Sequence, residues 1–191
     1  MNELLWWFGR SSGLVAYVAL WSTMFFGVML GSRGGGGLLH SPTLLALHRA
    51  WSFSAVAITG AHVLAVVLSP GSPIPAVAAL VPFASPSLTG AVALGTLASW
   101  TLLLLVGTSL ARSHVPAWVW GAVHALSAGG FVLALAHGVF AGPDTASPWV
   151  RGTYVVTVSV FVSAVAHRLA LASASRTASS PPSSTRRRDF V

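Results

Sequence analysis

The sequence predicts an all-α membrane protein, a polytopic bundle of five transmembrane helices with its N-terminus outside and its C-terminus inside the cell. Of the 191 residues, 54% are hydrophobic and only 7% are charged, which leaves too little polar surface to cover a soluble globule. Long apolar runs alternate with short clusters of arginine, proline and glycine. The ten basic residues, all arginine, are shared unequally between these clusters, which predicts the orientation.

The five spans follow from length and composition. A hydrocarbon core of about 30 Å is crossed by about 20 apolar residues in a helix, so the chain is divided where arginine, proline and glycine cluster. Residues 69–87 carry five prolines and no charge, and they are predicted to form an external loop rather than a sixth span. The predicted spans cover residues 12–31, 44–68, 88–111, 117–141 and 149–171.

The arginines distinguish the two orientations because cytoplasmic loops carry excess positive charge. With the N-terminus outside, Arg10 and Arg151 lie outside, and eight arginines lie inside. The first apolar segment is expected to remain as an anchor, because no strongly basic segment precedes it. Residues 1–171 are therefore predicted to form the membrane domain, and residues 172–191, rich in serine, proline and arginine, a disordered cytoplasmic tail. The inside arginines are Arg33, Arg49, Arg112, Arg168, Arg176, Arg186, Arg187 and Arg188.

Composition also excludes several classes of function. The chain has no cysteine, which rules out disulfides, thiolate-bound metals and iron–sulfur clusters, so any redox chemistry needs an added cofactor. The net charge of +7 is distributed as topogenic charge and not as a basic patch, so nucleic acid is not expected as a partner. The expected partner is membrane lipid, and the expected location is the inner membrane of a bacterial cell, with several passes.

Histidines inside a bilayer are functional candidates because ionisable groups are costly there. The chain has seven. His40, His114 and His167 are expected at or beside the cytoplasmic surface, where water is near, and they are assigned no ligand role. The other four are His48 and His62 in the span 44–68, and His124 and His137 in the span 117–141.

These four histidines form two pairs by depth. Both spans run from inside to outside, and counting from their starts places His48 level with His124 and His62 level with His137. The spacings of 14 and 13 residues correspond to about 21 and 20 Å along a helix. A zinc or copper site would gather its ligands within one small polyhedron, whereas two facing imidazoles suit the six-coordinate iron of a haem. Four such ligands predict two haems, one near each leaflet.

One geometric difficulty concerns the span 117–141. At about 100° per residue, 14 residues return close to the same face of a helix, but 13 residues fall about 140° short. A kink or a locally tighter turn at Gly129 and Gly130 would rotate His137 toward His62.

The chain resembles the ferric reductase-like transmembrane domain shared by ferric reductases, NADPH oxidases and the membrane haem subunit of bacterial periplasmic methionine sulfoxide reductase systems. The resemblance covers about residues 9–170. It rests on Gly9-Arg10-x-x-Gly13 before the first span, on His48-Arg49 opening the second, and on the histidine spacings of 14 and 13. It implies two b-type haems, with His48 and His124 on the inner iron and His62 and His137 on the outer iron.

The resemblance further implies a transmembrane electron-transfer subunit of an oxidoreductase. A cytoplasmic flavoprotein or a membrane quinol would donate electrons, and ferric iron or a periplasmic reductase would accept them. The chain departs from many relatives in having no cytoplasmic flavin and nicotinamide domain and no additional N-terminal helix, so the donor is expected to be a separate protein.

Haem propionates are anionic and need cationic partners near each membrane face. Arg49 and Arg112 are the candidates inside, and Arg10 and Arg151 outside; for each, the alternative is a topogenic or headgroup-binding charge. Phe131 lies between the two histidine levels and is a candidate to pack between the haems, with ordinary helix packing as the alternative.

Two other interpretations of the histidines remain open. They could form a polar path for protons or metal ions, although the three acids, Glu3, Asp144 and Asp189, all lie outside the predicted spans. They could also bond between helices in a haem-free structural or assembly subunit. Both alternatives predict a protein without haem.

Overall fold

The computed structural model describes residues 2–31 and 40–178, and in these ranges every regular element is a helix. Five stretches are long and apolar enough to cross a membrane: Glu3–Gly31, Ser41–Leu68, Thr89–Leu110, Ala117–Ala141 and Pro148–Leu171. The predicted class, an all-α bundle with five membrane-spanning helices, is confirmed. The helices are α1 (Asn2–Gly31), α2 (Ser41–Leu68), the short 3₁₀ helix η2 (Ala76–Ala79), α3 (Thr89–Leu110), α4 (Ala117–Ala125), α5 (Ser127–Ala141) and α6 (Pro148–Ala178).

Two helix ends differ from the prediction by more than three residues. The first helix begins at Asn2 instead of residue 12, because the segment before Ser12 contains no proline and Glu3 in the first turn favours the positive end of the helix dipole. The last helix continues past Leu171 to Ala178, so residues 172–178 are helical and are not part of a disordered tail. The rest of the predicted tail, and Arg33, Arg186, Arg187 and Arg188, lie outside the described residues.

The fourth span is broken, but not at the glycine pair. The N–H of Leu126 donates to the carbonyl of Val123 at 2.9 Å, an i to i+3 bond of the 3₁₀ type, and α4 ends there. The predicted distortion at Gly129 and Gly130 is therefore wrong in position, since both lie within the regular α5. The tighter turn at Leu126 adds rotation per residue, in the direction that 13 residues need to return to one face.

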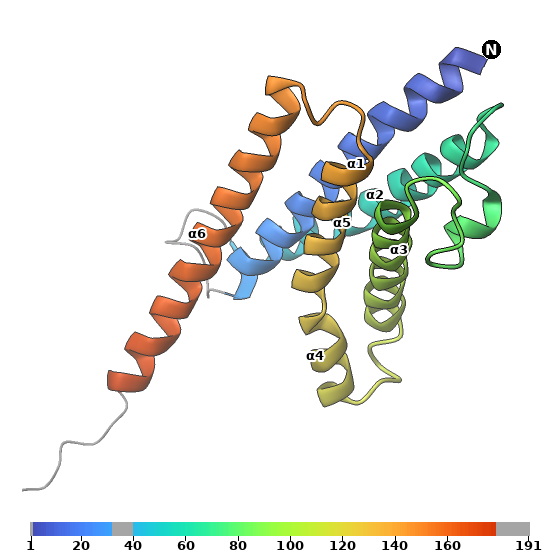
Figure 1. Cartoon of the computed structure of the whole chain (residues 1–191). Helices are drawn as coiled ribbons and strands as arrows, with labels where there is room; N and C mark the ends of the chain where they lie inside the picture. The colour runs from blue at the N-terminus through green and yellow to red at the C-terminus, as the bar shows by residue number, and fades with distance from the viewer. Residues whose placement is uncertain (1, 32–39, 179–191) are drawn as a thin grey trace, which may run out of the picture.

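The helices pack mainly as two pairs, and α6 lies at the side of them (Figure 1). α1 packs mainly on α2, and α3 packs mainly on α5. α6 packs on α1, where the buried hydroxyls of Tyr17 and Thr157 are 2.6 Å apart and Trp21 Nε1 donates to the Thr157 carbonyl at 2.9 Å. We call the end of the bundle that carries Asp144 and residues 69–88 the Asp144 end, and the opposite end the Arg112 end.

Residues 69–87 form no sixth span, as predicted, because the candidate spans before and after them end at Leu68 and begin at Thr89. The segment folds onto α3, because Thr96 Oγ1 donates to the carbonyl of Ala78 at 2.7 Å and Trp100 Nε1 donates to that of Leu80 at 3.0 Å. These bonds hold η2 over the Asp144 end.

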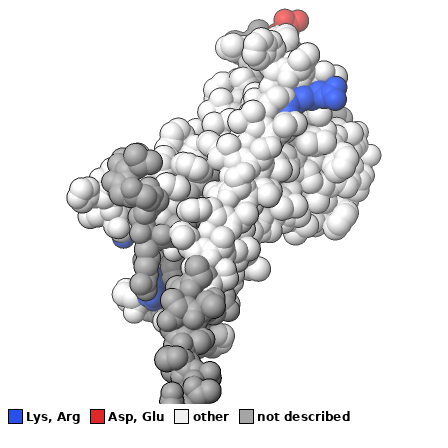
Figure 2. All heavy atoms as spheres, turned by 90° about the vertical axis from the view of Figure 1, so that its left-hand side faces the viewer, with Lys and Arg blue, Asp and Glu red and all other residues white. Residues whose placement is uncertain are grey.

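The surface suits lipid rather than water. Many large apolar side chains are exposed, such as Leu103 on α3 and Val155 and Val162 on α6. The face in Figure 2 is uncharged over most of its middle, and its charged atoms lie toward the ends of the molecule. A bilayer covers such a surface, so this is a multi-pass membrane protein.

Candidate cofactor site between the helix pairs

The four histidines singled out by depth meet as two pairs. The ring centres of His48 and His124 are 6.2 Å apart with planes inclined at 67°, and those of His62 and His137 are 6.3 Å apart with planes inclined at 72°. One partner of each pair comes from α2, and the other from α4 or α5. The structure thus brings together the same partners that the depth comparison predicts, and it separates the two pairs by 14 residues of continuous helix in α2, or about 21 Å.

Three of the four imidazoles are anchored to a neighbouring helix by the same device. His62 Nδ1 donates to the carbonyl of Gly9 at 2.8 Å, His48 Nδ1 to that of Thr23 at 2.9 Å, and His137 Nδ1 to that of Ala91 at 2.7 Å. A carbonyl can only accept, so the proton sits on Nδ1 and the lone pair on Nε2. These bonds fix the ring and leave Nε2 as the nitrogen that can bind a metal.

A glycine lies four residues after each acceptor carbonyl, directly against the ring. A Cβ at Gly13 would lie 2.9 Å from His62 Cε1, and one at Gly95 would lie 2.7 Å from His137 Cε1. At Gly27 the corresponding distance to His48 Cε1 is 3.2 Å. A larger residue would hold each imidazole away from its carbonyl, so the glycines are part of the anchor.

His124 is held differently. Its Nδ1 is buried and has no hydrogen-bond partner among the described residues. Its ring stacks on Trp120, with ring centres 4.7 Å apart and planes inclined at 17°, and the guanidinium carbon of Arg112 lies 4.6 Å from the centre of the Trp120 ring. Arg112, a candidate partner for a propionate, therefore forms the outer layer of a cation–aromatic–imidazole stack.

The ring separations fit a shared metal ion. First-row metals bind imidazole nitrogen at about 2.0–2.1 Å, and with ring bonds of about 1.33 Å a ring nitrogen lies about 1.1 Å from the ring centre. An iron bonded to two opposed Nε2 atoms would thus place the ring centres about 6.2–6.4 Å apart. Both observed separations, 6.2 and 6.3 Å, lie within this range. In the described ranges His, Asp and Glu form no cluster of three suited to one ion.

The His62 and His137 pair opens into a cavity of about 570 Å³ between the helix pairs, within the range of small-molecule and cofactor sites. Its lining is mostly apolar. Polar groups from several helices also line it, and such groups can fix the orientation of a bound cofactor. They include Arg10, Thr59, His62, Thr96, Ser99, His137, Asp144 and Tyr154.

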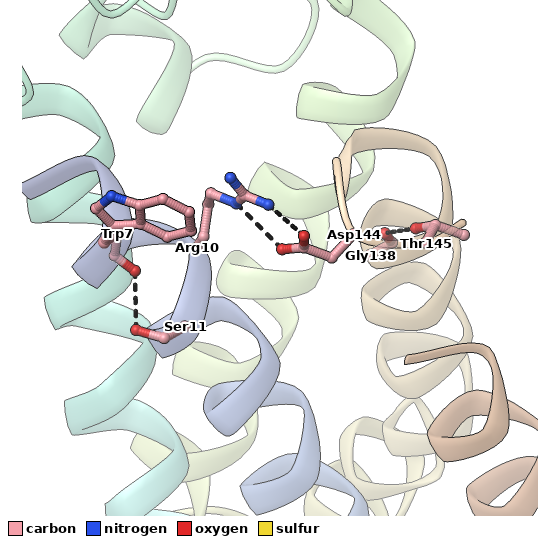
Figure 3. Close-up of polar contacts among 6 residues, drawn as sticks. All are labelled: Trp7, Arg10, Ser11, Gly138, Asp144 and Thr145. Atoms are coloured by element: carbon pink, nitrogen blue, oxygen red, sulfur yellow. Dashed lines mark hydrogen bonds and ion pairs between the residues drawn. The ribbon is translucent and has the colours of Figure 1, made fainter. Parts of the chain in front are cut away.

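Arg10 lies at the mouth of this cavity and is already engaged. Its guanidinium makes a two-point ion pair with Asp144, with Nε 3.1 Å from Oδ2 and the second nitrogen on Oδ1, and it lies 4.8 Å from the centre of the Trp7 ring (Figure 3). Thr145 Oγ1 donates to the Gly138 carbonyl at 3.2 Å beside it. The pair closes the Asp144 end by joining α1 to the turn after α5.

The other predicted site residues lie elsewhere. Arg49 and Arg151 are exposed, Arg49 next to His48 and Arg151 in the first turns of α6. Phe131 is buried, with its ring 5.7 Å from that of Tyr17 and 5.1 Å from that of Phe161. Its contacts with α1 and α6 place it in the packed core.

Sequence reasoning missed the anchoring glycines and carbonyls and the role of Trp120. One signal was present, because Gly13 and Gly27 are 14 residues apart, the same spacing as His48 and His62. Because α1 and α2 lie side by side, two glycines and two histidines with the same spacing can come into contact at both histidine levels.

Comparison with protein-family models, with curated proteins and with solved structures gives no match. The fold and the site define a multi-pass helical membrane protein with two facing imidazole pairs, stacked along the bundle.

Proposed function

We propose that the chain is a transmembrane electron-transfer subunit that holds two b-type haems, one between His48 and His124 and one between His62 and His137. The observation that supports this best is the separation of each ring pair, 6.2 and 6.3 Å, which suits a bis-imidazole iron. The apolar cavity around the second pair has room for a macrocycle.

The residues of the chain hold and insulate the sites. The Nδ1 bonds of three histidines keep Nε2 free of its proton and fix the ring planes. Apolar side chains of α1, α2, α3 and α5 form most of the lining of the cavity. Arg10 supplies a cation at its mouth, where a propionate would compete with Asp144. Haem, when bound, supplies reversible one-electron reduction of its iron.

Direction follows from the charges. Of the described arginines, Arg49, Arg112 and Arg168 lie toward the Arg112 end, and only Arg10 and Arg151 lie toward the other, so we assign the Arg112 end to the cytoplasm and the Asp144 end to the outside. A negative interior then favours outward electron movement by about 2.3 kcal/mol for each 100 mV. The proposed donor is a separate cytoplasmic flavoprotein or a membrane quinol, and the proposed acceptor is ferric iron or a periplasmic reductase. The proposed location is a bacterial inner membrane.

The test is a count of haem. The detergent-purified chain is examined by a reduced-minus-oxidised optical spectrum and by a pyridine haemochrome assay. We expect about two haem b per chain, falling toward one in His62→Ala or His137→Ala, whose partner ring is then left alone. His114→Ala, which changes an exposed histidine between α3 and α4, is the matched control and should retain both haems. A folded chain without haem would overturn the proposal and favour the transport or structural alternatives.

A further inference from the structure

The two imidazole pairs are not equivalent. At the Asp144 end both rings are anchored through Nδ1 to a backbone carbonyl, on α1 and on α3. At the Arg112 end only His48 is anchored in this way, and the Nδ1 of His124 has no hydrogen-bond partner within the described ranges. Hydrogen bonds to the second nitrogen orient a ligating imidazole and raise its basicity, so His124 lacks the support that the other three rings have.

The backbone under His124 is also less constrained. His124 lies in the last turn of α4, a helix of nine residues that ends at the tight turn of Leu126. His48 and His62 lie in the long, unbroken α2. The break at Leu126 separates His124 from α5, the helix that carries His137.

No glycine of the described residues lies against the ring of His124, as one does against each of the other three rings. At the Asp144 end, Gly95 of α3 lies against the ring of His137. The stack on Trp120, backed by Arg112, is thus the contact that holds the ring of His124. Stacking restrains the plane of a ring but, unlike a hydrogen bond, allows it to slide.

We infer that His124 is the exchangeable ligand of the chain, and that the site at the Arg112 end binds a small neutral ligand of the carbon monoxide class in its place. The inference rests on the proposed function. With the iron already in the ferrous state, the bond from iron to His124 Nε2 breaks and a bond from iron to carbon forms, with no change of oxidation state. Trp120 is a positioning residue in this scheme, because it acts on the metal only through His124.

The experiment adds carbon monoxide to the purified full-length chain after reduction with dithionite. The carbon monoxide difference spectrum is compared with the total haem from the pyridine haemochrome assay. We expect a complex that accounts for about half of the haem, because one of the two proposed irons has an exchangeable ligand.

Two variants assign the site. Trp120→Leu removes the stack and should speed carbon monoxide binding by about 10-fold, the lower end of the effect of losing a ligand's supporting contact. Arg112→Gln removes only the cation behind Trp120 and should give a smaller increase, which serves if Trp120→Leu fails to fold. Trp100→Leu is the matched control, since Trp100 Nε1 donates to the carbonyl of Leu80 in the segment that precedes α3, and it should leave the rate unchanged.

Each contrary result is distinct. A chain with two haems and no carbon monoxide complex would overturn the inference and leave the proposed function intact. The rate of carbon monoxide binding could instead be unchanged in Trp120→Leu and Arg112→Gln but higher in Gly95→Ala. That result would place the ligand exchange at His137 and would also overturn the inference about His124. A folded chain without haem would instead contradict the proposed function, and the inference would fall with it.

Discussion

The carbonyl oxygen of Ala91 accepts a hydrogen bond of 2.7 Å from Nδ1 of His137, a side chain 46 positions further along the chain. The bond joins α3 to α5 beside the cavity that His62 and His137 line. It also sets which nitrogen of His137 is protonated, so its loss should change the proposed haem site more than the fold.

The first prediction therefore concerns Gly95. In Gly95→Ala the new Cβ would lie 2.7 Å from His137 Cε1 and would push the ring off Ala91. We expect haem affinity at the Asp144 end to fall by about 10-fold to 100-fold, with haem per chain dropping toward one. Gly90→Ala on the same helix, where the new Cβ would meet nothing within 4 Å, should keep full loading. Equal haem content in the two variants would contradict the anchoring role.

A second prediction extends this to a graded series. The Cβ of Gly13→Ala would lie 2.9 Å from His62 Cε1, whereas that of Gly27→Ala would lie 3.2 Å from His48 Cε1. Haem loss should therefore be greater in Gly13→Ala than in Gly27→Ala, and Gly60→Ala, with open space around it, should lose none. The haem content of each purified variant gives the order, and a reversed order would show that close approach is not what the glycines provide.

The third prediction concerns the inclination of the paired rings. Ring planes inclined at 67° and 72° are far from parallel, and steeply inclined axial imidazoles give low-spin ferric haem a strongly anisotropic electron paramagnetic resonance spectrum. We expect such spectra from both sites of the oxidised chain. Trp120→Leu should shift only the signal of the Arg112 end, because Trp120 stacks on His124 alone among the four rings. Two signals typical of parallel imidazoles would refute the observed ring geometry.

The fourth prediction concerns the attachment of α6. Thr157 Oγ1 donates within its own helix, so the buried Tyr17 hydroxyl is the donor of the bond between them. Thr157→Val would leave this hydroxyl unpaired and should lower the free energy of unfolding in mixed micelles by about 1–3 kcal/mol. Thr153→Val, whose hydroxyl bonds only within α6 to Trp149, is the control and should change it far less. In the double variant Tyr17→Phe and Thr157→Val, where both partners are apolar, much of the loss should be recovered.

The fifth prediction concerns Arg168. Its guanidinium lies against Gly31, the last residue of α1, where a Cβ would be 2.8 Å from Cζ. A cation there complements the negative end of the helix dipole, an effect of about 0.3–1 kcal/mol. Arg168→Gln and Gly31→Val should each lower the melting temperature slightly, and combining them should add little, because both remove one contact. Arg151→Gln, at the exposed start of α6, should have no such effect.

The membrane-spanning architecture could be predicted from the sequence because the bilayer sets helix length and the lipid-facing surface is apolar. The helix ends that were predicted wrongly depend on features other than the length of the apolar run. Glu3 and Arg10 place charges in the segment before the predicted span, yet the segment remains helical, with Arg10 held by Asp144 and Trp7. The break at Leu126 carries no proline or glycine of its own, so no local signal marks it.

The histidine pairs could be predicted because depth in a membrane is a one-dimensional coordinate that the sequence carries. What holds each ring could not be predicted, because it depends on which helix lies beside which. Gly9 and Thr23 serve as acceptors only because α1 packs on α2, and Ala91 only because α3 packs on α5. The pairing of Arg10 with Asp144 likewise joins two segments far apart in the chain.

The division of the bundle into two pairs of helices has a consequence for biogenesis. α1 and α2 form one hairpin, and α3 with α4 and α5 forms the next. Each hairpin carries one histidine of each pair, so a nascent chain that has inserted only its first hairpin holds two half-sites and no complete one. Both sites then become complete in the same assembly step, when the second hairpin docks against the first.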